Sequence, residues 1–543
     1  MTKKRVLFFG ESHHLASGFG TYAKQVLERL AKTDKYELAE FACYGDPSAV
    51  GDLPWHYYGN LPQNDQQRSV YDSSPVHSFG MWRFGNAVLH FKPDIVITYR
   101  DPWMDNWIET SPLRKFFHWA WMPTVDSAPQ KREWLETFAT CDAVFTYSEY
   151  GERTLKAQCG DSINIIGCAS PGIDPKLYAP VEDKRKHKAS FDIPEDSFVV
   201  GTVMRNQRRK LFVELMKAFK IFLDKAPKEL AKKSYLYLHT SYPESAGWDI
   251  GRHILQQGIA SKVLCTYICQ NCGKWFVSKF KEAGTRCHFC GSNSANMPNV
   301  SHGLSIPELI KVYNLFDLYA QYAICEGFGM PQVEAASCGV PIASSNYSAM
   351  EDILEYTKGY PIKIDKLFRE LETDAERVYP CNEHMSEIML EYATISAEDR
   401  AQKVADARNG AVTRYDWDDT AAVWEKYIDS YTAVELQGKW DHPPQMRPSL
   451  NMPPPTVSDQ DFINWCFEMC GREYKTNGLE VYEHVASLRM GVNPKAGNAK
   501  FDRNIFLTSM NNYINECNNL EMMRVGNAPA PGVDSFFKEK ANV

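Results

Sequence analysis

The sequence has 543 residues, 44% of them hydrophobic and 24% charged, so it can bury several cores and should divide into two or three domains. No apolar run approaches the roughly 20 residues that span a bilayer. The N-terminus leads directly into a predicted strand, and we expect a soluble, cytoplasmic protein. The formal net charge of -8 gives no global attraction to nucleic acid or anionic membranes. The 15 cysteines, mostly single within apolar stretches, indicate reduced thiols and exclude a disulfide scaffold.

The first 180 residues or so alternate short β-rich runs with helical patterns. A strand is predicted over 5–10, and a helix follows with apolar residues at Tyr22, Val26, Leu27 and Leu30. Further strands are predicted over 93–99, 115–122, 143–147 and 163–166. This alternation predicts a parallel, doubly wound sheet in an N-terminal Rossmann-like domain, residues 1–182.

A second series of the same kind begins after the charged segment 182–188. Strands are predicted over 198–203, 234–239, 263–264, 318–320 and 340–343, with a helix over 211–219. The series predicts a second Rossmann-like domain, residues 190–430. Ligands of such sheets bind beyond the carboxyl ends of the strands, so the two halves should face one cleft.

The pattern changes after Tyr431, where prolines dominate a linker. Helical periodicity returns around 459–470 and 479–490, which predicts a helical extension over residues 456–525. The final segment, 526–543, has little apolar periodicity and is expected to be loose.

One segment of the second half carries the most information about chemistry. It reads EGFGMPQVEA from Glu326 to Ala335, with two glutamates separated by seven residues. The Gly-Phe-Gly loop opens a helix, so backbone N–H groups there can receive a phosphate or a sugar hydroxyl. Simple helix capping is the alternative. Two carboxylates, a glycine-rich entry and the following GVPI in one register favour a ligand site.

This segment closely resembles the signature of glycosyltransferase family 4 and its relatives. The resemblance implies a retaining enzyme of the GT-B type, an α/β fold of two Rossmann-like domains. It also implies that Glu326 contacts the donor sugar and Glu334 the ribose hydroxyls. The remaining donor-binding residues of the segment would be Gly327, Phe328 and Gly329.

A cationic loop after the strand 198–203 supports the same interpretation. Arg205 and Lys210 lie five residues apart, as in the Arg and Lys pair of that family. In a metal-independent enzyme such cations must neutralise the diphosphate as the glycosidic bond breaks, so both are candidate catalytic residues. A solvated basic loop is the alternative. Arg208 and Arg209 have no counterpart in the pattern.

The first half contributes weaker signals. Gly18 and Gly20 follow the first strand and resemble the family's loop beside the donor phosphates. His13 and His14 in the same loop could position a substrate, although loop histidines are more often solvated. Asp126 is carried over from an incomplete match after the strand 115–122, as a catalytic candidate on the acceptor side.

Two Cys-x-x-Cys-Gly knuckles lie inside the second half, over residues 265–295. Their spacing predicts a tetrahedral zinc ribbon with the ligands Cys269, Cys272, Cys287 and Cys290. A site closed by four thiolates is structural, and no catalytic metal is expected. Nearby cations and aromatic residues suit nucleic-acid contact or an ordinary protein surface.

The leading hypothesis is transfer of a hexosyl or pentosyl group from a nucleoside diphosphate sugar, with UDP or GDP, to a hydroxyl acceptor. DNA stays open as the acceptor, because some phage enzymes that glycosylate hydroxymethylcytosine share the GT-B architecture. A non-catalytic nucleotide-sugar or nucleic-acid binding protein on the same fold is the other alternative.

Overall fold

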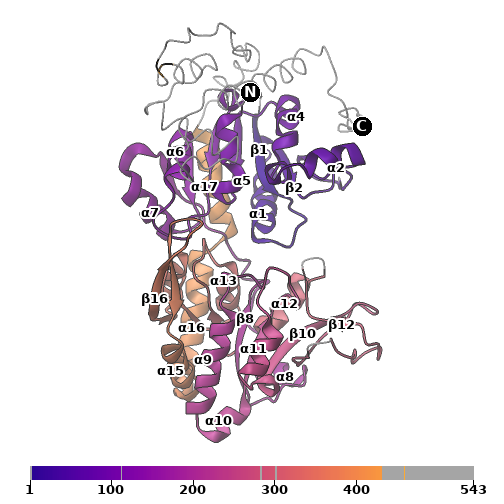
Figure 1. Ribbon diagram of the computed structural model, residues 1–543, viewed down its shortest axis with the longest axis vertical. Helices are drawn as coiled ribbons and strands as arrows, with labels where there is room; N and C mark the ends of the chain where they lie inside the picture. The colour runs from indigo at the N-terminus through magenta and orange to yellow at the C-terminus, as the bar shows by residue number, and fades with distance from the viewer. Residues whose placement is uncertain are drawn as a thin grey trace.

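The computed structural model describes residues 3–430, except 50, 112, 282, 283, 300 and 301, together with Ser458 and Asp461. Figure 1 shows two lobes stacked along the long axis, the first from the N-terminal part of the chain and the second from later residues. The predicted helical extension over 456–525 and its proline-rich linker lie outside the described residues, apart from these two positions. In the described part, no helix is long and apolar enough to cross a membrane.

The first lobe is built on a seven-stranded parallel sheet with the order β3-β2-β1-β4-β5-β6-β7. Its strands are β1 Lys4–Glu11, β2 Tyr36–Cys43, β3 His56–Gly59, β4 Ile95–Thr98, β5 His118–Trp121, β6 Ala143–Thr146 and β7 Ile165–Cys168. Its helices are α1 Gly18–Lys32, α2 Asp65–Tyr71, α3 Pro75–Ser78, α4 Met81–Phe91, α5 Pro102–Asp105, α6 Arg132–Thr140 and α7 Glu149–Cys159. The central strands are buried on both faces, as expected where helices cover both sides of a parallel sheet.

The second lobe contains an eight-stranded sheet with the main order β11-β10-β9-β8-β13-β14-β15, to which β12 adds beside β10. Its strands are β8 Phe198–Val203, β9 Ser234–His239, β10 Val263–Cys269, β11 Trp275–Lys279, β12 Ala295–Asn296, β13 Leu318–Gln321, β14 Ile342–Ser345 and β15 Tyr360–Ile362. A separate hairpin joins β16 Ile364–Arg369 to β17 Glu376–Pro380. The helices are α8 Lys184–Ala189, α9 Phe212–Lys225, α10 Lys228–Lys233, α11 Ile250–Gln256, α12 Ile306–Tyr313, α13 Met330–Ser337, α14 Ala349–Thr357, α15 Asn382–Thr394, α16 Ala397–Arg414 and α17 Trp417–Ser430.

Both sheets reverse their strand order at one point. In the first lobe this switch lies between β1 and β4, and in the second between β8 and β13. Such a switch leaves a crevice beyond the carboxyl ends of the two strands, where ligands of doubly wound folds bind. The loops after these four strands are therefore the places to look for function. The expected fold, two Rossmann-like parallel-sheet domains of the GT-B type, is confirmed.

The last described helix crosses back to the first lobe. In Figure 1, α17 lies beside the N-terminal helices although it follows the second lobe in the chain. Trp424 packs on Phe145 with ring centroids 4.2 Å apart, and its indole N–H donates to the Tyr22 hydroxyl at 2.7 Å. The predicted second domain, residues 190–430, includes α17, although this helix packs on the first lobe. The boundary at 430 stays a prediction.

The crossing depends on a tight approach at Gly172. A Cβ at this position would lie 2.2 Å from the Trp417 backbone nitrogen, so only glycine fits. The Ile173 N–H also donates to the Tyr415 carbonyl at 3.0 Å. The turn at 170–173 and the start of α17 are thereby held together.

Candidate active site

The centre of the candidate site is a cluster of Lys210, Glu326 and Gln321 at the switch point of the second sheet. Lys210 Nζ contacts Glu326 Oε1, and the Gln321 amide donates to the same oxygen at 2.6 Å. Lys210 comes from the loop after β8 and Glu326 from the loop after β13, and a β-bridge between Lys210 and Ala323 joins the two loops. Lys210 is 8% exposed and Glu326 is 6% exposed.

The charge of this cluster is only partly compensated. Burial and the nearby Arg209 guanidinium lower the pKa of Lys210 well below its usual value. A bound anion would offset both effects, because it supplies negative charge beside the buried amine. The cluster is therefore suited to receive a phosphate group.

Arg205, the other predicted catalytic cation, is not joined to this cluster. Its guanidinium is half exposed and pairs with Glu244, with Nε 2.8 Å from Oε1. The next residue, Asn206, fixes the loop, because its amide exchanges hydrogen bonds with the Trp248 backbone at 2.8 and 2.9 Å. A shared catalytic role of Arg205 and Lys210 stays a prediction.

Arg209 is a cation that the sequence pattern left without a role. Its charge contributes to the lowered pKa of Lys210. In the other lobe, it opposes the burial that raises the pKa of Asp101. Within the described part of the chain, Arg209 makes no ion pair, and its side chain is exposed. The only available signal was its position next to Lys210.

The Gly327–Gly329 loop passes close to the first lobe before α13 begins. A Cβ on Gly327 would lie 2.3 Å from Thr124 Cγ2, so glycine is required for this approach between the lobes. Gly329 has a left-handed φ of +100° and precedes α13, whose N-terminus has no side-chain cap. Phe328 is buried and meets Tyr415 edge to face at 5.3 Å.

Gln332, in the first turn of α13, is fully buried, and neither its amide nitrogen nor its oxygen has a hydrogen-bond partner among the described residues. An unpaired amide at a helix start that no side chain caps is what an anion or a sugar hydroxyl would bind.

Glu334, the predicted ribose ligand, lies further along α13. Its carboxylate accepts hydrogen bonds from Tyr178 at 3.1 Å and from Tyr313 at 2.5 Å. Burial raises the pKa of Glu334. A ribose hydroxyl would have to share these oxygens with the two phenols.

The two predicted glycines of the first lobe have different surroundings. Gly18 starts α1, and a Cβ there would lie 3.7 Å from Met330 Sδ, so the starts of α1 and α13 approach each other. Gly20 lies against the carbonyl oxygens of Ser12 and Leu15, 2.7 and 2.6 Å from an added Cβ. Gly20 is explained by packing of the loop, and Gly18 by the facing of the two helix starts.

Asp126, the acceptor-side candidate, bridges the lobes. It lies after β5 and pairs with Arg377 of β17 at 2.9 Å, while the Cys325 thiol donates to it at 3.2 Å. Burial would raise the pKa of Asp126, but the Arg377 charge more than offsets burial and the net shift is downward. Because Cys325 precedes Glu326, this bridge borders the central cluster.

Sequence reasoning missed Asp101, which follows β4 at the switch point of the first sheet. Burial raises its pKa to about 6. An Asp-Pro pair directly after the predicted strand 93–99 was the available signal. Asp101 and Arg209 bring opposite charges to the two facing edges.

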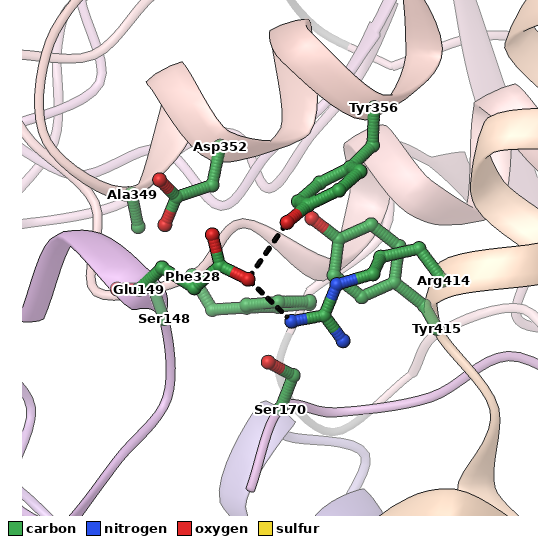
Figure 2. Close-up of a pocket in the computed structure, with 9 residues that line it drawn as sticks. All are labelled: Ser148, Glu149, Ser170, Phe328, Ala349, Asp352, Tyr356, Arg414 and Tyr415. Carbon is green, nitrogen blue, oxygen red and sulfur yellow. Dashed lines mark hydrogen bonds and ion pairs between the residues drawn. The ribbon is translucent and has the colours of Figure 1, made fainter. Parts of the chain in front are cut away.

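A small pocket lies between the lobes beside Phe328 (Figure 2). In Figure 2, the Glu149 carboxylate lies between the Tyr356 hydroxyl and the Arg414 guanidinium, 2.7 and 2.8 Å away. Asp352 accepts from the Tyr150 N–H at 2.8 Å across the same junction. These groups are used in contacts between the lobes.

The four predicted zinc ligands come together. The Sγ atoms of Cys269, Cys272, Cys287 and Cys290 all lie within 4.8 Å of one another. Cys269 ends β10, so the site grows out of the sheet edge, and the predicted strand at 263–264 is only the start of β10. Four converging cysteine sulfurs fit a structural metal ion, and zinc is the metal that this ligand set favours.

The geometry around the sulfurs also suits thiolates. Gly273 and Gly291 have left-handed φ values of +71° and +75°, as the knuckle turns require. Hydroxyl and amide donors surround the sulfurs, including the Phe289 N–H at 3.4 Å from Cys287 Sγ. Such donors stabilise the negative sulfur that a metal needs.

Part of the second lobe is similar to a known family. Residues 293–372 match the family model described as "Glycosyl transferases group 1". The matched span contains Glu326, the Gly327–Gly329 loop and Glu334. No curated protein matches the sequence.

Solved structures with the same architecture cover the described lobes at low sequence identity. Sucrose-phosphate synthase from Thermosynechococcus elongatus superposes with a TM-score of 0.56 and 15% identity, over 79% of this chain and 99% of that one. HepE of Anabaena, in complex with UDP and glucose, gives a TM-score of 0.52 and 14% identity, over 79% and 100%. An E. coli protein described as "Trehalose-6-phosphate", bound with UDP-2-fluoro glucose, gives a TM-score of 0.53 and 12% identity, over 79% of this chain and 100% of that one. At this identity the likeness concerns the fold.

Proposed function

We propose that the protein is a retaining glycosyltransferase that moves a hexosyl or pentosyl group from a UDP- or GDP-sugar to a hydroxyl acceptor. The observation that carries the proposal is the buried contact between Lys210 and Glu326, which joins the two loops at the switch point of the second sheet. The group 1 match over 293–372 and the neighbours that bind UDP or UDP-sugars support it.

The reaction breaks the bond between the anomeric carbon and the diphosphate oxygen and forms one to the acceptor oxygen. Negative charge grows on the diphosphate as it leaves, and the Lys210 ammonium and the start of α13 would stabilise that charge. Glu326 would accept hydrogen bonds from the sugar hydroxyls. The departing diphosphate would take the acceptor proton, so no protein base is assigned to this step.

The remaining site residues have supporting roles in the proposal. Arg205 would add a second cation after exchanging Glu244 for the diphosphate. Glu334 would bind the ribose, and Asp126 would order the acceptor-side loop through Arg377. Gly18, Gly327 and Gly329 would leave backbone room for the donor.

The test compares Lys210→Ala with Lys217→Ala, a matched lysine on α9 that pairs with Glu214 at the surface. Turnover of UDP-glucose and GDP-mannose is measured with calorimetric binding of UDP and GDP. We expect Lys210→Ala to lose about 100- to 1,000-fold in turnover, the effect of removing one group that stabilises developing charge. Equal turnover by both variants would contradict the proposal.

A second candidate acceptor is hydroxymethylcytosine in DNA, and the surface of the ribbon favours it. Between residues 263 and 299 the sequence has four Lys or Arg residues and one acidic residue. Phe289 is 56% exposed with Lys274 Nζ 4.9 Å from its ring centre. Cations beside an exposed ring suit phosphate contact and base stacking.

Labelled donor with hydroxymethylated duplex DNA tests this candidate, with unmodified duplex as the control. Transfer to the modified duplex alone, weakened by Lys274→Ala, would support it. Donor hydrolysis without transfer to either duplex would count against it. A non-catalytic binding protein would bind nucleotide but show neither hydrolysis nor transfer.

A further inference from the structure

A second constellation lies at the switch point of the first sheet, and none of the roles above uses it. For His13, in the loop after β1, the sequence left open a substrate-positioning role and a solvated side chain. Instead it is buried, with only 6% of its side chain exposed, and it pairs with Glu40. Glu40 lies within β2 at 0% exposure.

Glu40 is held by three donors, two of which come from His13. The His13 backbone N–H donates to Oε1 at 2.8 Å, and His13 Nδ1 lies 2.6 Å from Oε2. The Trp55 indole N–H donates to Oε2 at 3.1 Å. Burying a carboxylate in an apolar strand costs free energy, and an apolar residue of similar size would often be at least as stable. The arrangement is therefore better explained by what it does to His13.

The carboxylate selects one form of the imidazole. A carboxylate at Nδ1 keeps a proton on that nitrogen, so the neutral ring presents Nε2 as a hydrogen-bond acceptor. The hydrogen bonds of the described residues use Nδ1 of this ring and leave Nε2 without a partner. The ring is thus fixed and oriented, with one unpaired acceptor.

Aromatic side chains lie around the His13 ring. The His14 ring is exposed and 3.8 Å from the His13 ring, and Tyr57 lies 5.8 Å from His13 and 5.9 Å from His14. Trp55 meets His13 edge to face at 5.4 Å. Flat rings beside an oriented polar atom suit an acceptor that presents a hydroxyl on or beside its own ring.

The location matches the donor cluster. His13 precedes α1, and the start of α1 at Gly18 approaches Met330 at the start of α13. Loops at the two switch points therefore meet at the same junction between the lobes. A hydroxyl bound at His13 would be held on the side of the junction that faces the donor.

We propose that His13, held by Glu40 and Trp55, is the acceptor subsite, and that its Nε2 accepts a hydrogen bond from the hydroxyl that receives the sugar until that proton passes to the departing diphosphate. The inference rests on the proposed glycosyl transfer. Water, the smallest hydroxyl acceptor, binds at the same atom. Glu40 and Trp55 are positioning residues.

The decisive variant is His13→Asn. An asparagine amide can donate to Glu40 from the position of Nδ1, but it has no atom at the position of Nε2. The matched control is His56→Asn, since His56 also faces a glutamate, Glu37 at 3.5 Å, but leaves β3 on the face opposite to that of Tyr57, because side chains alternate along a strand. Glu40→Gln tests the positioning role.

Three measurements are made on the full chain: the melting temperature, the Kd of UDP, and kcat and KM for UDP-glucose. Acceptors are water, methyl α-glucoside or hydroxymethylated duplex DNA, and the last two arms separate a sugar acceptor from a base. We expect His13→Asn to keep the melting temperature and the Kd of UDP and to lose about 10- to 100-fold in kcat with every acceptor used. Glu40→Gln should show a smaller loss, and His56→Asn none.

Wild-type kcat in His13→Asn, or a loss explained entirely by weaker UDP binding, would overturn the inference. A second readout needs no acceptor. In protein labelled with ¹⁵N-histidine, the His13 resonances should show a proton on Nδ1 and none on Nε2, and the Nε2-protonated tautomer would contradict the assignment. A wild-type protein that binds no nucleotide would instead refute the proposed function. The ¹⁵N resonances of His13 would still report its tautomer, so the two failures can be told apart.

Discussion

The switch points of the two sheets make an instructive comparison. At the second sheet, Lys210 and Glu326 meet across two loops beside an uncapped helix start, an arrangement that we propose would bind the diphosphate of a nucleotide sugar. At the first sheet, His13 is fixed by a buried carboxylate and surrounded by rings. In the proposed function, the donor side would use general anion chemistry and the acceptor side one oriented atom. Donor binding and acceptor choice should therefore respond separately to mutation.

The largest expected effect concerns the ribbon, which belongs to the donor half alone. Removing the metal with a chelator, or replacing buried Cys287 by serine, should release about one zinc and destabilise the second lobe by several kcal/mol, because β10 and β11 lead into the site. Metal analysis and calorimetry measure both quantities.

In that experiment, unfolding of the first lobe should stay close to wild type. A variant of one of the four cysteine ligands that melts like wild type would contradict a structural role for the site. Loss of both lobes together would show that the halves are not separate in stability.

The next effect tests how firmly the two halves are joined. Arg377→Ala leaves the partly buried Asp126 carboxylate beside Cys325 without its cation, which should cost about 2 kcal/mol of unfolding free energy. Urea denaturation measures the loss. The double variant Arg377→Ala, Asp126→Asn should recover part of it, and a double variant no better than the single one would argue against the bridge.

The third effect separates two arginines of one loop. Arg209 is free of ion pairs within the described part of the chain, whereas Arg205 is held by Glu244. We expect Arg209→Ala to weaken UDP binding about 10-fold, as loss of a phosphate contact would. Arg205→Ala should have a smaller effect, because its guanidinium must first leave Glu244. Calorimetric titration compares them, and the reverse order would restore Arg205 as the leading cation.

The smallest effect is a pH dependence on the acceptor side. The pKa of Asp101 is raised to about 6, above the value near 4 of an unfolded chain. The folded state therefore favours the protonated form, and its contribution to stability is lost as pH rises from about 4 through 6. The unfolding free energy of Asp101→Asn relative to wild type should be about 1 kcal/mol higher at pH 7 than at pH 4. A constant difference in unfolding free energy across that range would contradict the raised pKa.

Much of the donor half could be predicted because its signals are local. Glu326 to Ala335 and the two cysteine knuckles carry their meaning in short spacings, and the structure brings both sets together. The strands of both sheets were also recognisable where apolar runs were continuous.

The rest depended on contacts between distant residues. Strand β2 was not predicted, because Glu37 and Glu40 interrupt its apolar pattern, and Glu40 is the residue that makes His13 informative. The Asp126–Arg377 bridge and the return of α17 join positions hundreds of residues apart, which no local spacing encodes.

The central claim is that Lys210, Glu326 and the start of α13 hold a nucleotide diphosphate between the lobes. A crystal structure of the protein soaked with UDP-glucose tests it directly. The account predicts a diphosphate oxygen about 3 Å from Lys210 Nζ and another at the backbone N–H groups that open α13. A diphosphate bound elsewhere, with Lys210 and Glu326 still in contact only with each other, would contradict it.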